Sequence, residues 1–181
     1  MNTKRKLWEL NRLSAEEFSQ KEKIPIVVLL DDLRSFENVG SVFRTADAFA
    51  IEEVVLCGIT PKPPHREIHK TALGATETVA WKYFSTTLEA VMHYKNQGYT
   101  IFSVEQASRT QPLHQLNLST SEKVVLVFGN EVHGVRQEVV DASDAVMEIP
   151  QFGTKHSLNV SVCVGIVLWE FSTQLNPALS S

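Results

Sequence analysis

Runs of β-branched and other apolar residues alternate with stretches of helical periodicity along most of this 181-residue chain. Such alternation is typical of an α/β domain in which helices connect the strands of a largely parallel sheet. Helices are expected near residues 39–50, 66–74, 86–97 and 135–142. Strands are expected at IPIVVLLDD, EEVVLCG, VAWKYF, YTIFSVE, KVVLVFG and DAVMEIP. The length suffices for one domain with a sizeable core.

Two segments near the ends of the chain need separate treatment. An N-terminal helix is expected after Ser14, because SAEE offers a serine hydroxyl and a glutamate three residues later, the pattern of a capping box. Residues 157–172 are apolar on nearly every side, so they are expected to be buried. Their β-branched content favours a strand, whereas their length and LWEF ending favour a helix. The pattern alone does not decide between the two.

The composition argues against several classes of protein. A formal net charge of −4 argues against a protein that coats nucleic acid non-specifically. The first residues lack the apolar core of a signal peptide, and the longest apolar run, VSVCVGIVLW, is too short to cross a bilayer. We therefore expect a cytoplasmic protein with no membrane partner. The two cysteines, Cys57 and Cys163, fit reduced, buried thiols better than a disulfide.

Positive charge is nevertheless concentrated in two places. Residues 1–23 hold six basic and four acidic side chains, and KPPHREIHK holds Lys62, Arg66 and Lys70 against Glu67 alone. Local patches of this kind can hold a phosphate backbone even on an acidic protein. Solvated helix faces are the simpler interpretation of any one of these residues.

Familiar cofactor and catalytic motifs are missing from the sequence. No G-x-G occurs, and GNEVHG continues with Val-Arg where a phosphate-binding loop needs Lys-Ser/Thr. His65 and His69 are spaced as a helical metal pair, but no third ligand is evident. There is no G-x-S-x-G elbow. A dinucleotide-binding protein, a P-loop NTPase, a metal enzyme and a serine hydrolase are therefore poor hypotheses.

A glycine-containing polar segment follows the first strand, within LDDLRSFENVGSVFRTADAF. Asn38 is expected to cap a helix that begins at Val39. At 100° per residue, Arg44 points away from the apolar face of that helix. It is either a functional side chain or an exposed arginine paired with Asp47.

Two further polar loops follow later strands, where α/β proteins bind their ligands. In FGNEVHG, Gly129 and Gly134 flank Glu131, which indicates either a plain turn or a ligand-binding loop. In IPQFGTKHSLNVS, Ser157 is expected to cap a helix. Asn159 needs hydrogen-bond partners if it is buried within the apolar segment.

The three segments NVGSVFRTA (38–46), FGNEVHG (128–134) and IPQFGTKHSLNVS (149–161) occur in the order of the three motifs of one family. Over residues 24–172 the sequence closely resembles the SpoU/TrmH family of RNA 2′-O-ribose methyltransferases, part of the SPOUT superfamily. The departures are small. Gln151 stands where methionine is common, and His133 and His156 occupy variable positions.

The resemblance implies a fold that the pattern could not supply. It implies an α/β parallel-sheet SPOUT fold with helices on both faces and a C-terminal trefoil knot, contrary to the general rule that chains do not knot. It also implies that residues 157–172 are helical and that the protein is a homodimer. The domains would be a basic N-terminal helical extension (1–23), the methyltransferase domain (24–172) and a C-terminal tail (173–181).

The resemblance further implies S-adenosylmethionine as the methyl donor and no metal. The cofactor-binding positions by motif match are Gly129, Ile149, Ser157 and Leu158. Glu105 or Gln106, after the fourth strand, is a further candidate. Main-chain contacts suit glycine turns, which let a ligand approach closely.

The catalytic residues implied by the motifs are Arg44, Asn38, Glu131, Ser157 and Asn159. Because guanidinium stays protonated, we expect Arg44 to grip a phosphate and favour the developing alkoxide, reaching across the dimer, and the proton acceptor stays open. RNA binding is expected at Arg44 and at the three cations of KPPHREIHK, with tRNA favoured over rRNA. The alternative is a knotted RNA-binding protein that has lost catalysis.

Overall fold

The computed structural model describes residues 2–10, 12–119 and 121–176. Its centre is a seven-stranded sheet in the order β3-β2-β1-β6-β4-β7-β5, and every neighbouring pair is parallel. The parallel α/β architecture expected from the sequence is confirmed. The strands are β1 (Ile24–Asp31), β2 (Ile51–Cys57), β3 (Ala80–Phe84), β4 (Thr100–Val104), β5 (Gln111–Pro112), β6 (Val124–Phe128) and β7 (Ala145–Glu148).

Alternation along the central strands divides the core into two apolar layers. In β1, Ile26, Val28 and Leu30 face one layer, whereas Val27 and Leu29 face the other, and all five are fully buried. Burial on both sides explains why this strand is continuously apolar. All six expected strands are present. Only the two-residue β5 was not expected, because so short a segment has no periodicity.

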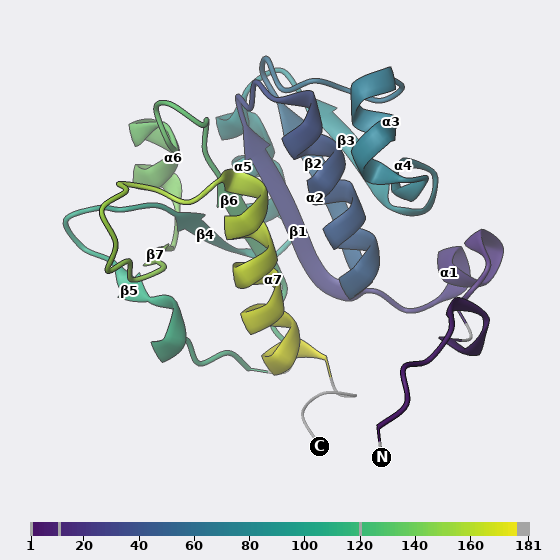
Figure 1. The fold of residues 1–181 in the computed structure, drawn as a ribbon. Coiled ribbons are helices and arrows are strands. Elements are labelled where there is room, and N and C mark those ends of the chain that lie inside the picture. The colour runs from purple at the N-terminus through teal and green to yellow at the C-terminus, as the bar shows by residue number, and fades with distance from the viewer. Residues whose placement is uncertain (1, 11, 120, 177–181) are drawn as a thin grey trace.

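Helices cover both faces of the sheet, as the resemblance implied. On one face lie α2 (Phe36–Phe49), α3 (Arg66–Ala72), α4 (Ala75–Thr78) and α7 (Val160–Leu175), and on the other lie α5 (Thr87–Lys95) and α6 (Gln137–Ala142). In Figure 1, α2 and the yellow α7 lie side by side in front of β1. The first and last parts of the domain therefore pack together.

The start of α2 differs from the prediction. The helix begins at Phe36 and is capped by Ser35, whose hydroxyl accepts a hydrogen bond from the backbone N–H of Asn38 at 3.1 Å. Asn38 therefore lies in the first turn, and its side chain is free for other contacts. Further along α2, Gly40 touches α3, because a Cβ at this position would lie 2.1 Å from Oγ1 of Thr71.

The segments near the two ends of the chain can be compared with the remaining predictions of secondary structure. The helix α1 (Ala15–Gln20) follows a short 3-10 turn, η1 (Leu7–Leu10), and carries the expected capping box at Ser14. The ambiguous apolar segment is helical from Val160 and runs to Leu175 as α7, whereas residues 157–159, which were expected to be helical, precede the helix. No helix in the described part of the chain is long and apolar enough to cross a membrane.

One side of α7 remains uncovered within a single chain, contrary to the expectation of burial on all sides. Val164, Val167, Leu168 and Phe171 are fully buried against the sheet and α2. On the opposite side Val162, Ile166 and Trp169 are 51%, 39% and 56% exposed. The sequence pattern cannot distinguish burial within the chain from an apolar surface that awaits a partner.

Candidate active site

A cavity of about 540 Å³ lies at the carboxyl ends of β6, β4 and β7. Its walls are the loops that follow these strands, together with the first turn of α7. The neighbouring strand β1 connects outward to β2 and β3, while β6 and β4 lie on its other side. The strand order therefore reverses between β1 and β6, beside the cavity, and ligands of open parallel sheets bind outside the carboxyl ends of the strands near such a point, so the cavity is the candidate active site.

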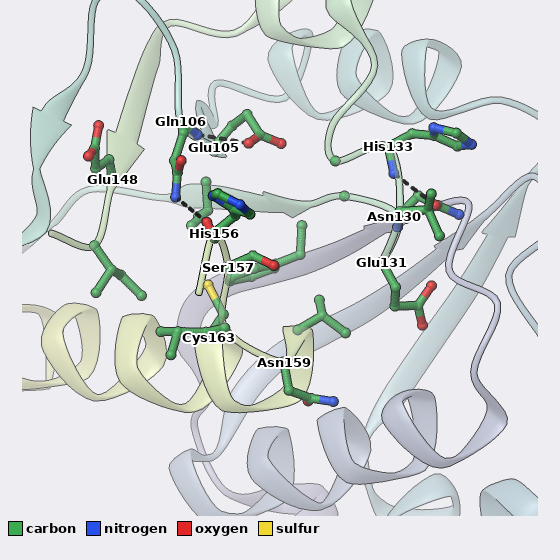
Figure 2. Close-up of a pocket in the computed structure, with 18 of the residues that line it drawn as sticks. Glu105, Gln106, Asn130, Glu131, His133, Glu148, His156, Ser157, Asn159 and Cys163 are labelled. Carbon is green, nitrogen blue, oxygen red and sulfur yellow. Dashed lines mark hydrogen bonds between the residues drawn. The ribbon is translucent and has the colours of Figure 1, made fainter. Parts of the chain in front are cut away.

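The structure brings every position matched to cofactor binding to this one cavity. Gly129, Ile149, Ser157 and Leu158 line it, and so do Glu105 and Gln106. Of the residues matched to catalysis, Glu131, Ser157 and Asn159 also line it. Figure 2 shows Glu105, Gln106 and His156 on one side of the cavity and Asn130, Glu131 and His133 on the other.

The loop that follows β6 has a tight, internally bonded conformation. Asn130 and Gly134 exchange two backbone hydrogen bonds, of 3.0 and 2.9 Å. The Oδ1 of Asn130 also accepts from the N–H groups of Val132 and His133, at 2.9 and 3.2 Å. A Cβ on Gly129 would lie 2.0 Å from the carbonyl carbon of Gly134, so only glycine fits there.

Sequence reasoning gave Asn130 no role, although its side chain holds this turn together. Its amide nitrogen also donates to the carbonyl oxygen of Asp32, at the end of β1, at 2.5 Å. The signal that could have found it is an asparagine followed by polar turn residues, because Asn side chains bond the backbone two or three residues on.

The loop after β4 is bonded to both other loops of the cavity. One carboxylate oxygen of Glu105 accepts from the N–H of Val135 at 2.8 Å, and the other accepts from the N–H of Gln106 at 2.8 Å. The side-chain amide of Gln106 donates to the carbonyl oxygen of His156 at 2.9 Å, as Figure 2 shows. The cavity walls are thus fixed relative to one another.

The carboxylate of Glu131 is the acceptor for three donors at the start of α2. The N–H groups of Arg34 and Ser35 donate to it at 2.9 and 3.1 Å, and the side-chain amide of Asn38 donates at 3.0 Å. Partial burial of this carboxyl opposes ionisation, but these hydrogen bonds outweigh it, so the pKa of Glu131 lies below its usual range. Glu131 is therefore a weak base that orders the loop.

Asn159 joins this group from the start of α7. Its side-chain amide donates to Oδ1 of Asn38 at 3.1 Å, and its own Oδ1 accepts from the N–H of Ser161 at 2.9 Å. Asn159 is thus the cap of α7, whereas Ser157 was expected to be a cap and instead lies exposed in the loop before the helix. Asn159 is exposed rather than buried. Side chains of all three motif segments form one hydrogen-bonded line.

Arg44 lies apart from this line. It is exposed on α2 and does not line the cavity, and no described residue forms an ion pair with it. Asp47, the alternative partner considered above, instead accepts from the hydroxyl of Thr78 at 2.6 Å. The guanidinium is therefore available to a ligand or to another chain.

The three predicted RNA-binding cations lie outside the cavity, on and before α3. Lys62, Arg66 and Lys70 are all exposed. His65 caps α3, where its Nδ1 accepts from the N–H of Glu67 at 3.2 Å. Within residues 2–10, 12–119 and 121–176, no three His, Cys, Asp or Glu side chains lie close enough together to hold a metal ion.

An ion pair between Asp31 and Arg136 joins the end of β1 to the start of α6. Asp31, fully buried at the end of β1, accepts from the N–H of Arg136 at 3.1 Å and from its Nε at 3.2 Å. The hydroxyl of Thr87 also donates to this carboxylate. Asp31 is fully buried whereas the Arg136 side chain is 37% exposed, so removing the charge of Arg136 would leave a buried carboxylate without its partner, which is strongly destabilising.

The two cysteines are free, as expected, although only Cys57 is fully buried. Cys163 is partly buried and lines the cavity. Burial, with the nearby carboxylate of Glu105, raises the pKa of Cys163 to about 12. It therefore contributes a neutral thiol to the cavity wall rather than a nucleophile.

A parallel sheet with a loop-lined cavity at its carboxyl ends is the ligand-binding architecture of α/β proteins, and comparison with known proteins identifies the family. Residues 25–169 match the model of the SpoU rRNA Methylase family. The chain belongs to this family, so the resemblance given by the three motifs is confirmed.

Known relatives are similar over most of this chain. An uncharacterized tRNA/rRNA methyltransferase of Borreliella burgdorferi is 30% identical over 89% of the chain and 69% of its own length. The 23S rRNA (guanosine-2′-O-)-methyltransferase RlmB of Neisseria meningitidis is 31% identical over 83% of the chain. This chain covers 59% of the length of that relative.

A solved structure supports the same assignment. The AdoMet-bound rRNA methyltransferase of Sinorhizobium meliloti superposes with a TM-score of 0.74 at 26% identity, over 90% of this chain and 60% of that one. The parallel sheet with helices on both faces is therefore the family's methyltransferase fold.

Proposed function

We propose that this protein transfers a methyl group from S-adenosylmethionine to a ribose 2′-hydroxyl of an RNA. The observation that carries the proposal is the hydrogen-bonded line from Glu131 through Asn38 to Asn159 at the edge of the cavity. It joins one polar side chain from each of the three motif segments. The family, and the named activity of the 23S rRNA relative, support the same reaction.

The cavity suits the cofactor in size and chemistry. About 540 Å³ is within the range of pockets that hold small ligands, and the turn that begins at Gly129 forms part of its wall. Ile149 and Leu158 supply apolar walls, and Ser157 supplies a polar group. When bound, S-adenosylmethionine supplies an electrophilic methyl group. The residues of the cavity bind and orient it.

The RNA hydroxyl needs activation, because an alcohol is a weak nucleophile until its proton is lost or polarised. We assign this role to Arg44. Its guanidinium stays protonated and cannot take the hydroxyl proton, so it grips the neighbouring phosphate through two N–H groups and favours the developing alkoxide, while the released proton passes to solvent. Asn38, held by Glu131 and Asn159, orients the ribose.

The reaction in this proposal takes place in a homodimer. Arg44 does not line the cavity of its own chain, which supports a role in the cavity of a partner. The exposed apolar side of α7, formed by Val162, Ile166 and Trp169, supplies a surface for a second copy. The C-terminal trefoil knot implied by the resemblance belongs to the same proposal.

The RNA substrate is proposed to be tRNA, with rRNA as the second candidate, since relatives carry names of both kinds. A catalytically inactive RNA-binding protein is the competing function. Its weakness is that the side chains of all three motif segments are present and joined, which binding alone does not require.

The test measures transfer of label from S-adenosylmethionine to unmodified tRNA and rRNA fractions. The wild type, Arg44→Ala and Arg44→Lys are compared, and cofactor binding is measured by calorimetry. The expected result is label in the ribose of one RNA fraction, lost in Arg44→Ala, with cofactor affinity unchanged. A wild-type protein that binds RNA, binds no cofactor and transfers no label would favour the inactive RNA-binding protein.

A further inference from the structure

A second cavity, of about 530 Å³, lies away from the motif segments, and we call it the α3–β3 pocket. It shares no lining residue with the first cavity. We propose that the α3–β3 pocket binds an unpaired nucleobase of the RNA substrate, with preference for a base that carries an exocyclic amine. The inference rests on the proposed RNA substrate and adds the site by which that RNA is recognised.

The walls of the α3–β3 pocket suit a flat aromatic ligand. Trp81, on the edge strand β3, lines the pocket and packs partly against the core, so its ring is held in place. Pro63 and Ile68 add apolar surface, and the imidazoles of His65 and His69 add two more rings. Aromatic rings on a rigid support are the usual platform for an unstacked base.

Positive charge beside the pocket suits the phosphates on either side of such a base. Glu67 is engaged by Lys70, whose Nζ lies 2.8 Å from both carboxylate oxygens. Arg66 is only loosely paired, at 3.9 Å from Glu67, and its side chain is 84% exposed. Lys62 lies before α3, with its Nζ 3.8 Å from the centre of the Tyr83 ring. Arg66 and Lys62 are therefore available to phosphate.

The acidic residue in the wall indicates which bases fit. Glu77 lines the pocket, is exposed, and forms no ion pair with any residue in the described ranges. A carboxylate accepts hydrogen bonds only, so it favours the amino groups of adenine, cytosine and guanine. Uracil has no exocyclic amine, and the N3–H donor on its Watson–Crick edge lies between two carbonyl oxygens that a carboxylate repels, so it is disfavoured.

The pocket is connected to the candidate active site through the start of α2. The ring of His65 stacks on Phe36, with centroids 4.0 Å apart and planes at 30°. Phe36 is the first residue of α2, two positions before Asn38. Because Gly40 also brings α2 against α3, the pocket keeps a fixed position relative to Asn38. A base held here would belong to a nucleotide near the methylated one.

The first experiment observes the pocket without any need for catalysis. The protein is labelled with 5-fluorotryptophan, the Trp81 signal is assigned from Trp81→Phe, and AMP, CMP, GMP, UMP and inorganic phosphate are titrated in turn. We expect the Trp81 signal to shift with AMP, CMP and GMP, less with UMP, and not with phosphate. A Trp81 signal that no nucleotide shifts, or that phosphate shifts equally, would overturn the inference.

The second experiment measures KM for the RNA substrate in Arg66→Ala and Glu77→Gln. A control, Lys123→Ala, removes an exposed charge outside the α3–β3 pocket, directly before the central strand β6. We expect KM to rise about five- to hundredfold in Arg66→Ala and the control to match the wild type, with kcat and cofactor affinity unchanged. Glu77→Gln should weaken the preference for amino-bearing bases. Wild-type KM and base preference in both variants would contradict the inference.

The two proposals fail in different ways. If the wild type transfers no methyl group, the proposed function is wrong, yet the fluorine signal of Trp81 still reports whether nucleotides bind. If methyl transfer is normal and the Trp81 signal is silent, the inference about the α3–β3 pocket is wrong and the proposed function stands.

Discussion

The side-chain amide of Asn159 donates to Oδ1 of Asn38 at 3.1 Å, although the two residues are 121 positions apart in the sequence. Asn38 in turn donates to Glu131 at 3.0 Å. Both ends of the Asn38 amide are thereby used, which fixes its orientation. The start of α2, the loop after β6 and the start of α7 therefore hold one another in position.

The Asn38–Asn159 contact predicts non-additive effects of mutation. We expect Asn38→Ala and Asn159→Ala each to destabilise the fold, and the double variant to lose less than the sum, with a coupling of about 0.5–1 kcal/mol. Thermal or denaturant unfolding of the four proteins measures this free energy. Additive losses would show that the hydrogen bond does not join the two segments in solution.

Gly129 is predicted to be irreplaceable for steric reasons. In Gly129→Ala the new methyl group would meet the backbone of Gly134 at 2.0 Å, so we expect a loss of about 3 kcal/mol in stability together with weaker cofactor binding. Gly153→Ala is the matched control, because nothing lies within 4 Å of a Cβ there. Equal melting temperatures for the two variants would contradict the tight turn.

The lowered pKa of Glu131 predicts a dependence of stability on pH. The unfolded carboxyl takes up its proton at a higher pH than the folded one, so the stabilisation is complete above the ordinary range of a glutamate pKa. It is lost as pH falls through the folded pKa. We expect the melting temperature of the wild type to exceed that of Glu131→Gln near pH 7. The difference should shrink as the pH falls below the ordinary range of a glutamate pKa. A difference independent of pH would show that ionisation is not involved.

Arg44 is predicted to act in the cavity of the partner chain. Arg44→Ala and Gly129→Val are each expected to be inactive, the second because its side chain cannot fit against the backbone of Gly134 and therefore distorts the wall of the cofactor cavity. If equal amounts of the two variants exchange subunits, half of the dimers contain one subunit of each variant. Each of these dimers has one complete site of two, so about a quarter of the wild-type rate should return. A mixture that stays inactive despite exchange, shown by native mass spectrometry, would place Arg44 in its own chain's site.

The exposed side of α7 is predicted to mediate dimerisation. Trp169→Glu places a charge in the apolar surface that also contains Val162 and Ile166, so we expect a monomer by sedimentation velocity. Met92→Glu is the control, because Met92 is comparably exposed at 48%, on α5, on the other face of the sheet. The wild type should be a dimer, and a wild-type monomer would refute the dimeric arrangement.

Local patterns predicted most of the fold. The strands are continuous apolar runs because the sheet is covered on both faces, and this signal needs no knowledge of distant contacts. The capping box at Ser14 is likewise local. The start of α2 was placed wrongly because Ser35 and Asn38 are both good caps, and the packing of the preceding loop decides between them. Ser157 and Asn159 posed the same ambiguity at α7.

The candidate site could be predicted only in part. The residues came from motif resemblance, and the cavity collects them, but their mutual hydrogen bonds join positions 93 and 121 residues apart that no local pattern relates. The α3–β3 pocket was missed because Trp81 alternates with other residues of an ordinary edge strand. Its contact with α3 arises only when the sheet and helices pack.

The packing at Gly40 has a consequence for fidelity. Since Gly40 of α2 packs directly against Thr71 and the backbone of α3, we expect the helix that bears Arg44 and Asn38 and the helix that bears Arg66 to move as one body. The distance between the RNA segment bound by α3 and the reacting ribose is thereby fixed. A bulkier residue at position 40 should push α2 and α3 apart and so increase that distance. Variant molecules that still fold and transfer methyl groups would then modify the wrong nucleotide.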